Sequence, residues 1–206
     1  NNLALSAEGQ RSDLSGLVRI TASEIMSAYV LPDVIKELRL RAPQIRVEVV
    51  ASDDIENLIQ RDADIALRHV RPEQPDLVAR LLCEHVGYFY ADKGYLDSRG
   101  PPKSVEDLSQ FDWIAMGDID RMQAYLAAMG INLPRKVFRL NSQSTLVGWE
   151  LAKSGLGICP MDAKIADHTP HMLRVLPKEL TVTFPIWLVT HREIHTNPRI
   201  RLVFDL

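Results

Sequence analysis

The chain has 206 residues, of which 46% are hydrophobic and 25% are charged, and its formal net charge at pH 7 is −3. That composition is enough for a buried core and excludes a disordered chain. No segment approaches about 18 uninterrupted apolar residues, so no membrane span is expected. Because the chain lacks a dense run of Lys and Arg, it is not expected to bind DNA on its own.

The two cysteines, Cys83 and Cys159, lie far apart in the sequence. A disulfide between them stays open, but two isolated cysteines in a chain without signal-peptide architecture favour buried thiols of a cytoplasmic protein. We interpret Cys159 as a small core residue rather than a reactive thiol, because no charged neighbour in the sequence would lower its pKa.

The first 70 residues alternate between strand-like and helix-like segments. Strands rich in β-branched residues are expected over residues 16–22, 45–51 and 63–68. A helix with one apolar face follows the first strand, with Ser23 or Ser27 as its cap and Pro32 either in its first turn or at a kink. A short helix over residues 53–61 follows the second strand. This order is typical of a parallel sheet covered by helices.

A second block of the same kind follows. Strands are expected over residues 77–92, 112–116, 135–141, 156–160 and 180–191. Helices are expected over residues 104–111, 118–130, 142–155 and 197–206. The last helix has an Asn cap and a proline at its first position. The sequence therefore predicts two similar α/β halves, with the chain passing between them near residues 87–92 and 185–191.

Two glycines one residue apart, Gly155 and Gly157, end the helix expected over residues 142–155. Gly155 is expected to take the left-handed conformation that ends many helices, because this conformation costs glycine little. Gly157 is expected to open a buried strand that the preceding helix approaches closely. The turn is either an ordinary helix-to-strand connection or a support for a ligand site at the other end of the helix.

Four motifs occur in a recognisable order: GLVRITAS, LPDVIKELRLRAPQIRVEVV, LIQRDADIALR and NSQSTLVGWELAKSGLGICP. Together they resemble the effector-binding domain of LysR-type transcriptional regulators. The resemblance runs from Gly16 to Leu206, and each motif alone is weak, whereas their order and spacing are specific. The turn GLGICP is one residue shorter before its proline than the form most common in that family.

The resemblance implies an α/β fold of two Rossmann-like subdomains joined by two crossover strands, like type 2 periplasmic binding proteins. Subdomain I would comprise residues 16–88 and 188–206, and subdomain II residues 89–187. Residues 1–15 would be the end of a linker helix. In the family this helix joins an N-terminal winged helix-turn-helix, which would lie outside this chain and bind DNA.

Open α/β sheets bind ligands at the carboxyl ends of their strands. Such ends are expected at residues 21–24, 68–72 and 141–145, and the first and last also begin helices, whose N–H groups and dipole favour anions. The resemblance implies the same three places for the effector. The candidate effector-binding residues are Ala22, Ser23, Arg68, His69, Asn141, Ser142 and Gln143.

Plainer roles are open for several of these residues. Ser23 and Ser142 are explained equally well as helix N-caps, and Arg68 as a bridge between the two subdomains. Glu24 departs from what an anion site needs, because a carboxylate that pointed inward would repel an anionic effector. The expected effector is a small polar molecule that carries a carboxylate.

No catalytic motif indicates an enzyme: the sequence has no G-x-S-x-G elbow, no glycine-rich dinucleotide motif and no P-loop. The pairs His191 with His195 and His168 with His171 have close spacing. However, the first follows a strand and a Thr-Pro step disfavours a helix in the second, so no metal site is expected. No cofactor is expected either.

The expected partners are a small-molecule effector and a second copy of the chain, with a tetramer in the full-length protein. In the family, effector domains pair head to tail. The helix over residues 31–41 and the strand over residues 45–50 would contribute here, because Leu40 lies off the helix's apolar face. The alternative is a solute-binding protein of the same fold, against which the missing signal peptide and the free cysteines count.

Overall fold

The computed structural model describes residues 14–53 and 63–206. These residues divide into two compact units. Unit 1 contains the described chain up to Cys83 together with Pro185–Leu206, and unit 2 contains Glu84–Phe184. The α/β fold with two Rossmann-like units is the one expected from the sequence.

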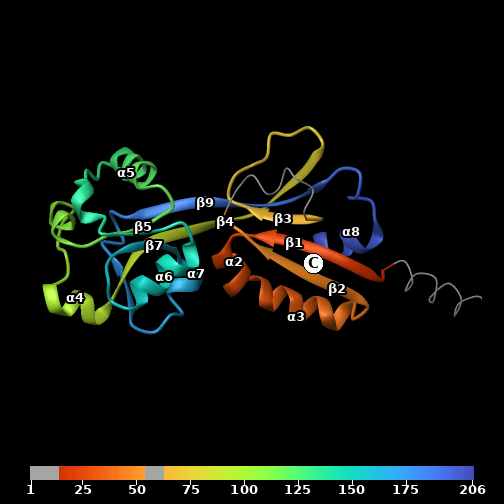
Figure 1. Ribbon diagram of the computed structural model, residues 1–206, viewed down its shortest axis with the longest axis horizontal. Coiled ribbons are helices and arrows are strands. Elements are labelled where there is room, and N and C mark those ends of the chain that lie inside the picture. Colours follow the sequence, from red (N-terminus) through yellow and green to blue (C-terminus); the bar gives the residue numbers. More distant parts are fainter. Residues whose placement is uncertain (1–13, 54–62) are drawn as a thin grey trace, which may run out of the picture. The chain divides into compact units, whose positions relative to one another are not determined.

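Two long strands continue from one unit into the other, β4 (Leu77–Asp92) and β9 (Thr181–His191) (Figure 1). The chain therefore crosses the division twice. The crossings fall between residues 83 and 84 and between residues 184 and 185, a few residues before the expected boundaries after residues 88 and 187.

The sheet of unit 1 has three parallel strands, in the order β2 (Ile45–Ala51), β1 (Gly16–Ala22) and β3 (Ile65–Arg68). β9 runs antiparallel to β3, with Arg68 opposite Trp187. Because β1, β2 and β3 are parallel, their carboxyl ends lie at one edge of the sheet, where open α/β sheets bind ligands.

The helices of unit 1 agree with the sequence only in part. The single helix expected after β1 is two helices in the structure, and Ser23 caps the first of them, whereas the second has no side-chain cap. α2 (Glu24–Tyr29) follows β1, and α3 (Leu31–Arg41) has Pro32 in its first turn and lies alongside β2 (Figure 1). α8 (Pro198–Phe204) is capped by Asn197, whose side-chain oxygen accepts a hydrogen bond from the N–H of Arg199. The Asn cap followed by proline therefore marks the start of this helix correctly.

The strands of unit 2 belong to two sheets. β5 (Ile114–Met116) and β6 (Leu140–Ser142) are parallel neighbours. β7 (Cys159–Asp162) and β8 (Met172–Val175) both pair antiparallel with β4. The helices are α4 (Lys93–Arg99), α5 (Ile119–Ala128), α6 (Thr145–Lys153) and α7 (Ala163–Ala166). Figure 1 draws α5 on one side of β5 and β7, and α6 and α7 on the other, as in other Rossmann-like units.

Aromatic side chains fill the core of unit 2. Trp113 is fully buried and meets the ring of Phe89 edge-on at 5.4 Å and the ring of Phe138 at 6.3 Å. Its indole N–H donates to the carbonyl of Leu108 over 3.1 Å. The core thus has no uncompensated polar atom at this position.

The two turn glycines are both required by backbone geometry. Gly155 has a φ of 74° and Gly157 a φ of 153°. A Cβ atom on Gly157 would lie 2.6 Å from the carbonyl oxygen of Asp112. The atoms nearest to Gly157 thus belong to the segment leading into β5, and not to the preceding helix.

Several expected elements begin later than the sequence suggests, and two of them show a clear physical reason. The strand expected over residues 135–141 starts with a 3₁₀ turn, Arg135–Val137, because Pro134 holds an extended conformation and Val137 turns into the core. The helix expected over residues 142–155 starts only at Thr145, because the hydroxyl of Ser144 caps it by accepting from the N–H of Val147 over 3.1 Å.

Several short elements were missed or assigned the wrong type. The helix expected over residues 104–111 is a 3₁₀ helix, Glu106–Gln110, and α4, α7 and β8 were not expected at all. α4 has a readable start, because the Asp92 side chain accepts from the N–H of Tyr95 over 3.1 Å. Elements of four to seven residues carry too little periodicity to be found from the sequence alone.

Two expectations lie mainly outside the described residues. These are the linker segment at residues 1–15 and the short helix at residues 53–61. Among the described helices, none is long and apolar enough to cross a membrane.

Candidate functional site

In unit 1, the structure brings four of the expected residues to one edge of the sheet. β1 and β3 are adjacent and parallel, with Thr21 opposite Ala66. Both strands therefore end at the same edge. The residues found there are Ala22, Ser23, Arg68 and His69.

Ser23 is the N-cap of α2. Its hydroxyl accepts from the N–H of Met26 over 3.4 Å, and the N–H of Glu24 donates to the Asp53 carboxylate over 3.0 Å. The first turn of this six-residue helix is therefore partly satisfied by the protein's own groups. The plainer reading of Ser23 as a cap is correct, and an anion would meet a carboxylate already in place.

Arg68 is a buried charged residue at this edge, with 8% of its surface exposed. Its guanidinium donates from Nη1 to the carbonyl of Leu67 over 2.9 Å and from Nη2 to the hydroxyl of Thr21 over 3.1 Å. Both acceptors belong to unit 1. The buried Nε has no acceptor among the described residues.

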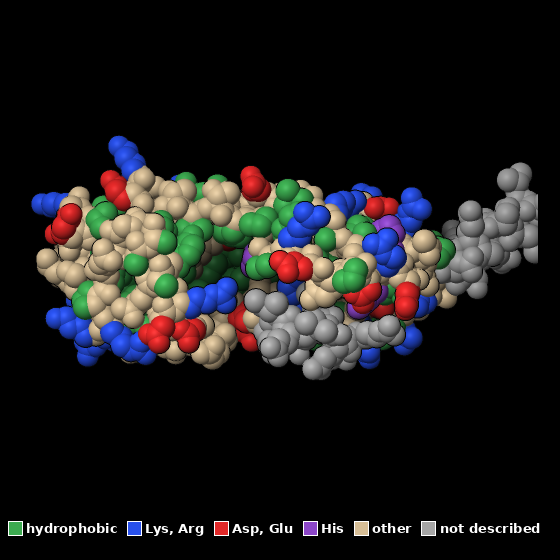
Figure 2. Space-filling view, turned by 90° about the horizontal axis from the view of Figure 1, so that it is seen from above, with side chains coloured by type: hydrophobic (Ala, Val, Ile, Leu, Met, Phe, Trp, Pro, Cys, Tyr) green, Lys and Arg blue, Asp and Glu red, His purple; other side chains and the backbone are tan. Residues whose placement is uncertain are grey.

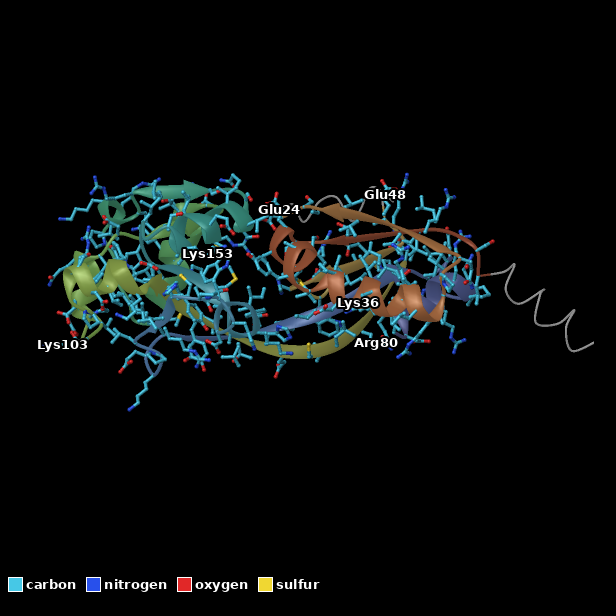
Figure 3. The ribbon with its side chains drawn as sticks, turned by 90° about the horizontal axis from the view of Figure 1, so that it is seen from below. Glu24, Lys36, Glu48, Arg80, Lys103 and Lys153 are labelled. Atoms are coloured by element: carbon cyan, nitrogen blue, oxygen red, sulfur yellow. The ribbon has the colours of Figure 1, made fainter. Side chains whose placement is uncertain are left out.

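Burial lowers the pKa of the Arg68 guanidinium, and the nearby Asp53 carboxylate partly offsets this by raising it. An arginine nevertheless stays charged at neutral pH. Unit 1 therefore holds a desolvated cation with one unused N–H at the carboxyl edge of its sheet. Two further residues lie at this edge: His69 is exposed, and Glu24 is the first residue of α2 (Figure 3).

In unit 2, the structure brings the other three expected residues together at the end of β6. Asn141 is exposed, and Ser142 ends the strand. The Ser142 carbonyl accepts from the N–H of Gly117 over 2.8 Å, and the side-chain amide of Gln143 donates to the Gly117 carbonyl over 3.4 Å. The ends of β5 and β6 are thus tied to each other at the carboxyl edge.

Ser142 is not a helix cap. Its hydroxyl oxygen accepts from the N–H of Ser144 over 3.1 Å, and Ser144 in turn caps α6. A hydroxyl that accepts in this way can still donate its own hydrogen to a ligand. Ser142 therefore stays available as a donor at the edge, whereas Ser144 is committed to the helix.

A second polar group, which the sequence did not predict, lies at the same edge of unit 2. The buried His85 lies between Asp162 and Lys164: its Nδ1 contacts Asp162 Oδ2, and its Nε2 lies 3.1 Å from Lys164 Nζ. The N–H of Lys164 also donates to Asp162 Oδ1 over 2.9 Å. No sequence motif marks this group, because β4 and the end of β7 are 77 residues apart. Asp53 was missed for the same reason, whereas Thr21 lies within the expected strand end at residues 21–24 but was not a candidate binding residue.

The described residues offer little for metal binding or covalent chemistry. They contain no cluster of three or more His, Cys, Asp or Glu side chains that could hold a metal ion. Cys159 is fully buried, and burial raises the pKa of its thiol far above the usual range. A thiol in this environment is a poor nucleophile. On the face drawn in Figure 2, acidic and basic side chains are interspersed.

The chain forms two Rossmann-like units and passes between them twice. Each unit has polar groups at the carboxyl ends of parallel strands. These features define a ligand-binding domain of the type 2 periplasmic-binding-protein class. The chain belongs to the LysR substrate binding domain family, whose model matches residues 11–206. This family forms the effector-binding part of LysR-type transcriptional regulators.

Curated relatives are transcriptional regulators. The chain is 25% identical over 195 residues to the HTH-type regulator CrgA of Neisseria meningitidis serogroup C, covering 92% of this chain and 65% of that protein. It is 24% identical over 198 residues to the activator TtdR of Escherichia coli K12, covering 92% and 63%. The chain therefore spans a little under two thirds of these relatives.

Solved structures support the fold. The regulatory domain of CrgA from Neisseria meningitidis superposes with a TM-score of 0.82 at 24% identity, covering 93% of this chain and 96% of that one. Full-length AphB of Vibrio cholerae gives a TM-score of 0.73 at 22% identity, covering 99% and 72%. The comparisons favour a regulator over the solute-binding protein that the sequence left as an alternative.

Proposed function

We propose that this domain senses a small polar metabolite that carries a carboxylate, and that it controls DNA binding by a winged helix-turn-helix elsewhere in the full-length protein. The observation that supports this most is Arg68, a buried guanidinium with an unused Nε–H at the carboxyl edge of unit 1. A carboxylate that accepts from Nε would complete its hydrogen bonds.

The energetics of Arg68 favour a ligand. Burying a cation is costly unless it is paired and hydrogen-bonded, and here one donor is left without an acceptor among the described residues. A guanidinium presents a planar fork that matches a carboxylate. The Asp53 carboxylate already accepts from Glu24, so the ligand group would approach the Nε side of Arg68 and not the start of α2.

The carboxyl edge of unit 2 also carries groups that can bind a polar ligand. Ser142 can donate its hydroxyl hydrogen, and the Gln143 amide is exposed beside it. A ligand acts as a signal only when it binds one conformation of the protein better than another. Here β4 and β9 are the segments through which a change could pass between the units, because they belong to both.

We further propose that the domain works as a cytoplasmic homodimer, and as a tetramer in the full-length regulator. The relatives named HTH-type regulators are longer than this chain, which supports a DNA-binding part outside it.

The 206 residues themselves carry a net charge of −3. We therefore expect no tight, sequence-specific gel shift with this chain alone, because phosphate contacts dominate DNA affinity.

A thermal-shift screen tests the proposal. Small carboxylates are each compared with the matching primary amide, so that size and shape are kept while the charge is removed. A compound at a hundred times its Kd should add roughly 2.7 kcal/mol to stability. The screen is repeated with Arg68→Met, which keeps the apolar part of the side chain. The matched control is Arg46→Met, because Arg46 is exposed and lies at the amino end of β2, away from the carboxyl edge.

The expected result is a hit among the carboxylates that its amide does not reproduce, lost in Arg68→Met and kept in Arg46→Met. If amides stabilise the protein as well as their acids do, the anionic character of the effector is wrong. If Arg68→Met binds a confirmed hit as tightly as the parent chain, Arg68 is a structural residue.

A further inference from the structure

Unit 2 carries a cation at the carboxyl edge of its strands, and the strand registers place it there. A parallel bridge joins Trp113, just before β5, to Ile158, just before β7, and the N–H of Ile114 donates to the Ile158 carbonyl over 2.9 Å. β7 therefore runs in the direction of β5 and β6. Its end, at Asp162, and the following Lys164 lie on the carboxyl side of the sheet, as Ser142 does.

β4 lies beside the end of β7, and its residues from Glu84 onward belong to unit 2. Gly87 of β4 lies opposite Asp162 in an antiparallel pair, so His85, two residues earlier, lies beyond the end of β7. His85 is buried, with 7% of its surface exposed, and the ring of Phe184 meets it edge-on at 6.0 Å. The imidazole is therefore held by packing as well as by its polar partners.

The hydrogen bonds of His85 fix which of its nitrogens carries the proton. The ammonium of Lys164 can only donate, so the His85 Nε2 that lies 3.1 Å from it must accept. The proton of a neutral imidazole is then on Nδ1, where it donates to the Asp162 carboxylate. Asp162 thus sets the tautomer of His85, and His85 sets the position of the Lys164 ammonium.

This arrangement leaves the ammonium able to bind a ligand. Lys164 is exposed, and an ammonium has three N–H donors, of which His85 takes one. The other described segments at this edge, residues 84–85, 117–118 and 141–144, contain no Lys or Arg. The carboxylate of Asp118 accepts from the N–H of Arg121 over 2.9 Å, so it is committed as the cap of α5.

We infer that Lys164 recognises a carboxylate of the effector on unit 2, and that His85 and Asp162 are positioning residues that hold its ammonium. The inference rests on the proposed function, since it names the group that unit 2 adds to the same binding process. Lys164 gives unit 2 a cation at the carboxyl edge of its own strands, as Arg68 does for unit 1.

The test compares sodium succinate and sodium benzoate with succinamide and benzamide, added to the 206-residue chain. The readouts are the thermal shift and the ¹⁵N chemical shifts of the His85 ring, which report its tautomer and its contact with Lys164. Variants are Lys164→Met, Lys164→Arg and, as the matched control, Lys153→Met, whose lysine lies in the last turn of α6 (Figure 3).

We expect the acids, and not the amides, to shift the His85 ring signals and the melting temperature. Lys164→Met should abolish the response at His85 and weaken binding of an acid about tenfold or more, as for other hydrogen bonds to charged groups. Lys164→Arg should keep part of the binding, and Lys153→Met should leave it unchanged. His85→Phe should weaken binding, whereas His85→Gln, which can accept and donate in the same way, should restore part of it.

The outcomes separate this inference from the proposed function. If the acids bind and Arg68→Met prevents binding while Lys164→Met does not, the proposed function stands and the role of Lys164 is wrong. If His85→Phe and His85→Gln weaken binding equally, His85 does not position Lys164 through its hydrogen bonds. If no acid causes a response at either unit, the carboxylate assignment is overturned for both.

Discussion

The guanidinium of Arg68 donates to the hydroxyl of Thr21 over 3.1 Å, across the neighbouring parallel strands β3 and β1. Both residues are buried, with 8% and 1% of their surfaces exposed. The bond holds a cation in the plane of the sheet edge, close to the start of α2. It therefore links the stability of unit 1 to the orientation of the group proposed to bind the effector.

Thr21→Val should destabilise the domain, because valine keeps the shape of threonine but leaves a buried guanidinium N–H without its acceptor. A lost partner for a buried polar group costs about 1–3 kcal/mol. Urea denaturation of the parent chain, Thr21→Val and Thr21→Ser checks this. Thr21→Ser keeps the hydroxyl and should lose less stability than Thr21→Val. A valine variant at least as stable as the serine variant would show that the bond contributes nothing.

Two serines two residues apart should respond differently to alanine. Ser144 caps α6 through the N–H of Val147, so Ser144→Ala should cost about 1 kcal/mol of stability and leave effector binding largely intact. Ser142→Ala should cost less stability and weaken binding of an effector found in the screen. Denaturation and titration calorimetry on the same two variants check both effects, and equal effects of the two substitutions on binding would contradict the assignment.

The sequence predicted the fold from features that repeat over many residues. Alternation in residues 16–22 and 45–51, helical spacing after Leu31, and the Asn-Pro start of α8 are all confirmed. These signals are local, so they need no knowledge of what lies across the sheet. Local periodicity predicted two α/β halves, and the family motifs added that two crossover strands join them.

The candidate site was predicted only in part. The sequence located the strand ends that carry Ser23, Arg68 and Ser142, because these ends follow from the order of strands. It could not show that Thr21 accepts from Arg68, nor that His85 meets Lys164, since such contacts depend on strand register across 47 and 79 residues of sequence.

Gly157→Ala should be one of the more damaging small substitutions in this protein. Its φ is 153°, and an added Cβ would lie 2.6 Å from the Asp112 carbonyl oxygen, which is also the acceptor for the N–H of Ile158. Backbone must therefore move where β7 joins β5. We expect a loss of more than about 2 kcal/mol, as for other buried steric conflicts.

Gly117→Ala is the matched control. Its φ is also positive, 85°, but an added Cβ would meet no atom within 4 Å. Only the conformational cost of about 1–2 kcal/mol for a side chain in the left-handed region applies. Thermal or urea denaturation compares the two variants, and equal losses would mean that the contact with Asp112 relaxes without cost.

The two cysteines should differ in reactivity. Cys159 is fully buried and burial raises the pKa of its thiol, whereas Cys83 is only half-buried on β4. The thiolate is the reactive form, so near pH 8 iodoacetamide should modify Cys83 well before Cys159. Mass spectrometry of the native chain over time measures this, with Cys83→Ser as the control for assignment. Rapid modification of Cys159 in the folded chain would contradict the prediction.

The proposed dimer makes the last prediction. Leu40 on α3 is 74% exposed and Val49 on β2 is 38% exposed. β2 is also an edge strand of its sheet and lies beside α3. An exposed edge next to apolar side chains is a ready surface for a second copy. The chain should therefore have about twice the 23.3 kDa of one protomer in solution.

Light scattering coupled to size-exclusion chromatography measures that mass over a range of concentrations. Leu40→Glu and Val49→Lys should each shift the protein towards the monomer, because a charged side chain would have to be buried on pairing. The matched control is Val70→Glu, at a residue that is 57% exposed but lies on neither α3 nor β2, and it should leave the mass unchanged. A parent chain that stays monomeric at high concentration would rule out the dimer for this domain alone. A dimer that Leu40→Glu and Val49→Lys leave intact would instead place the interface on another face.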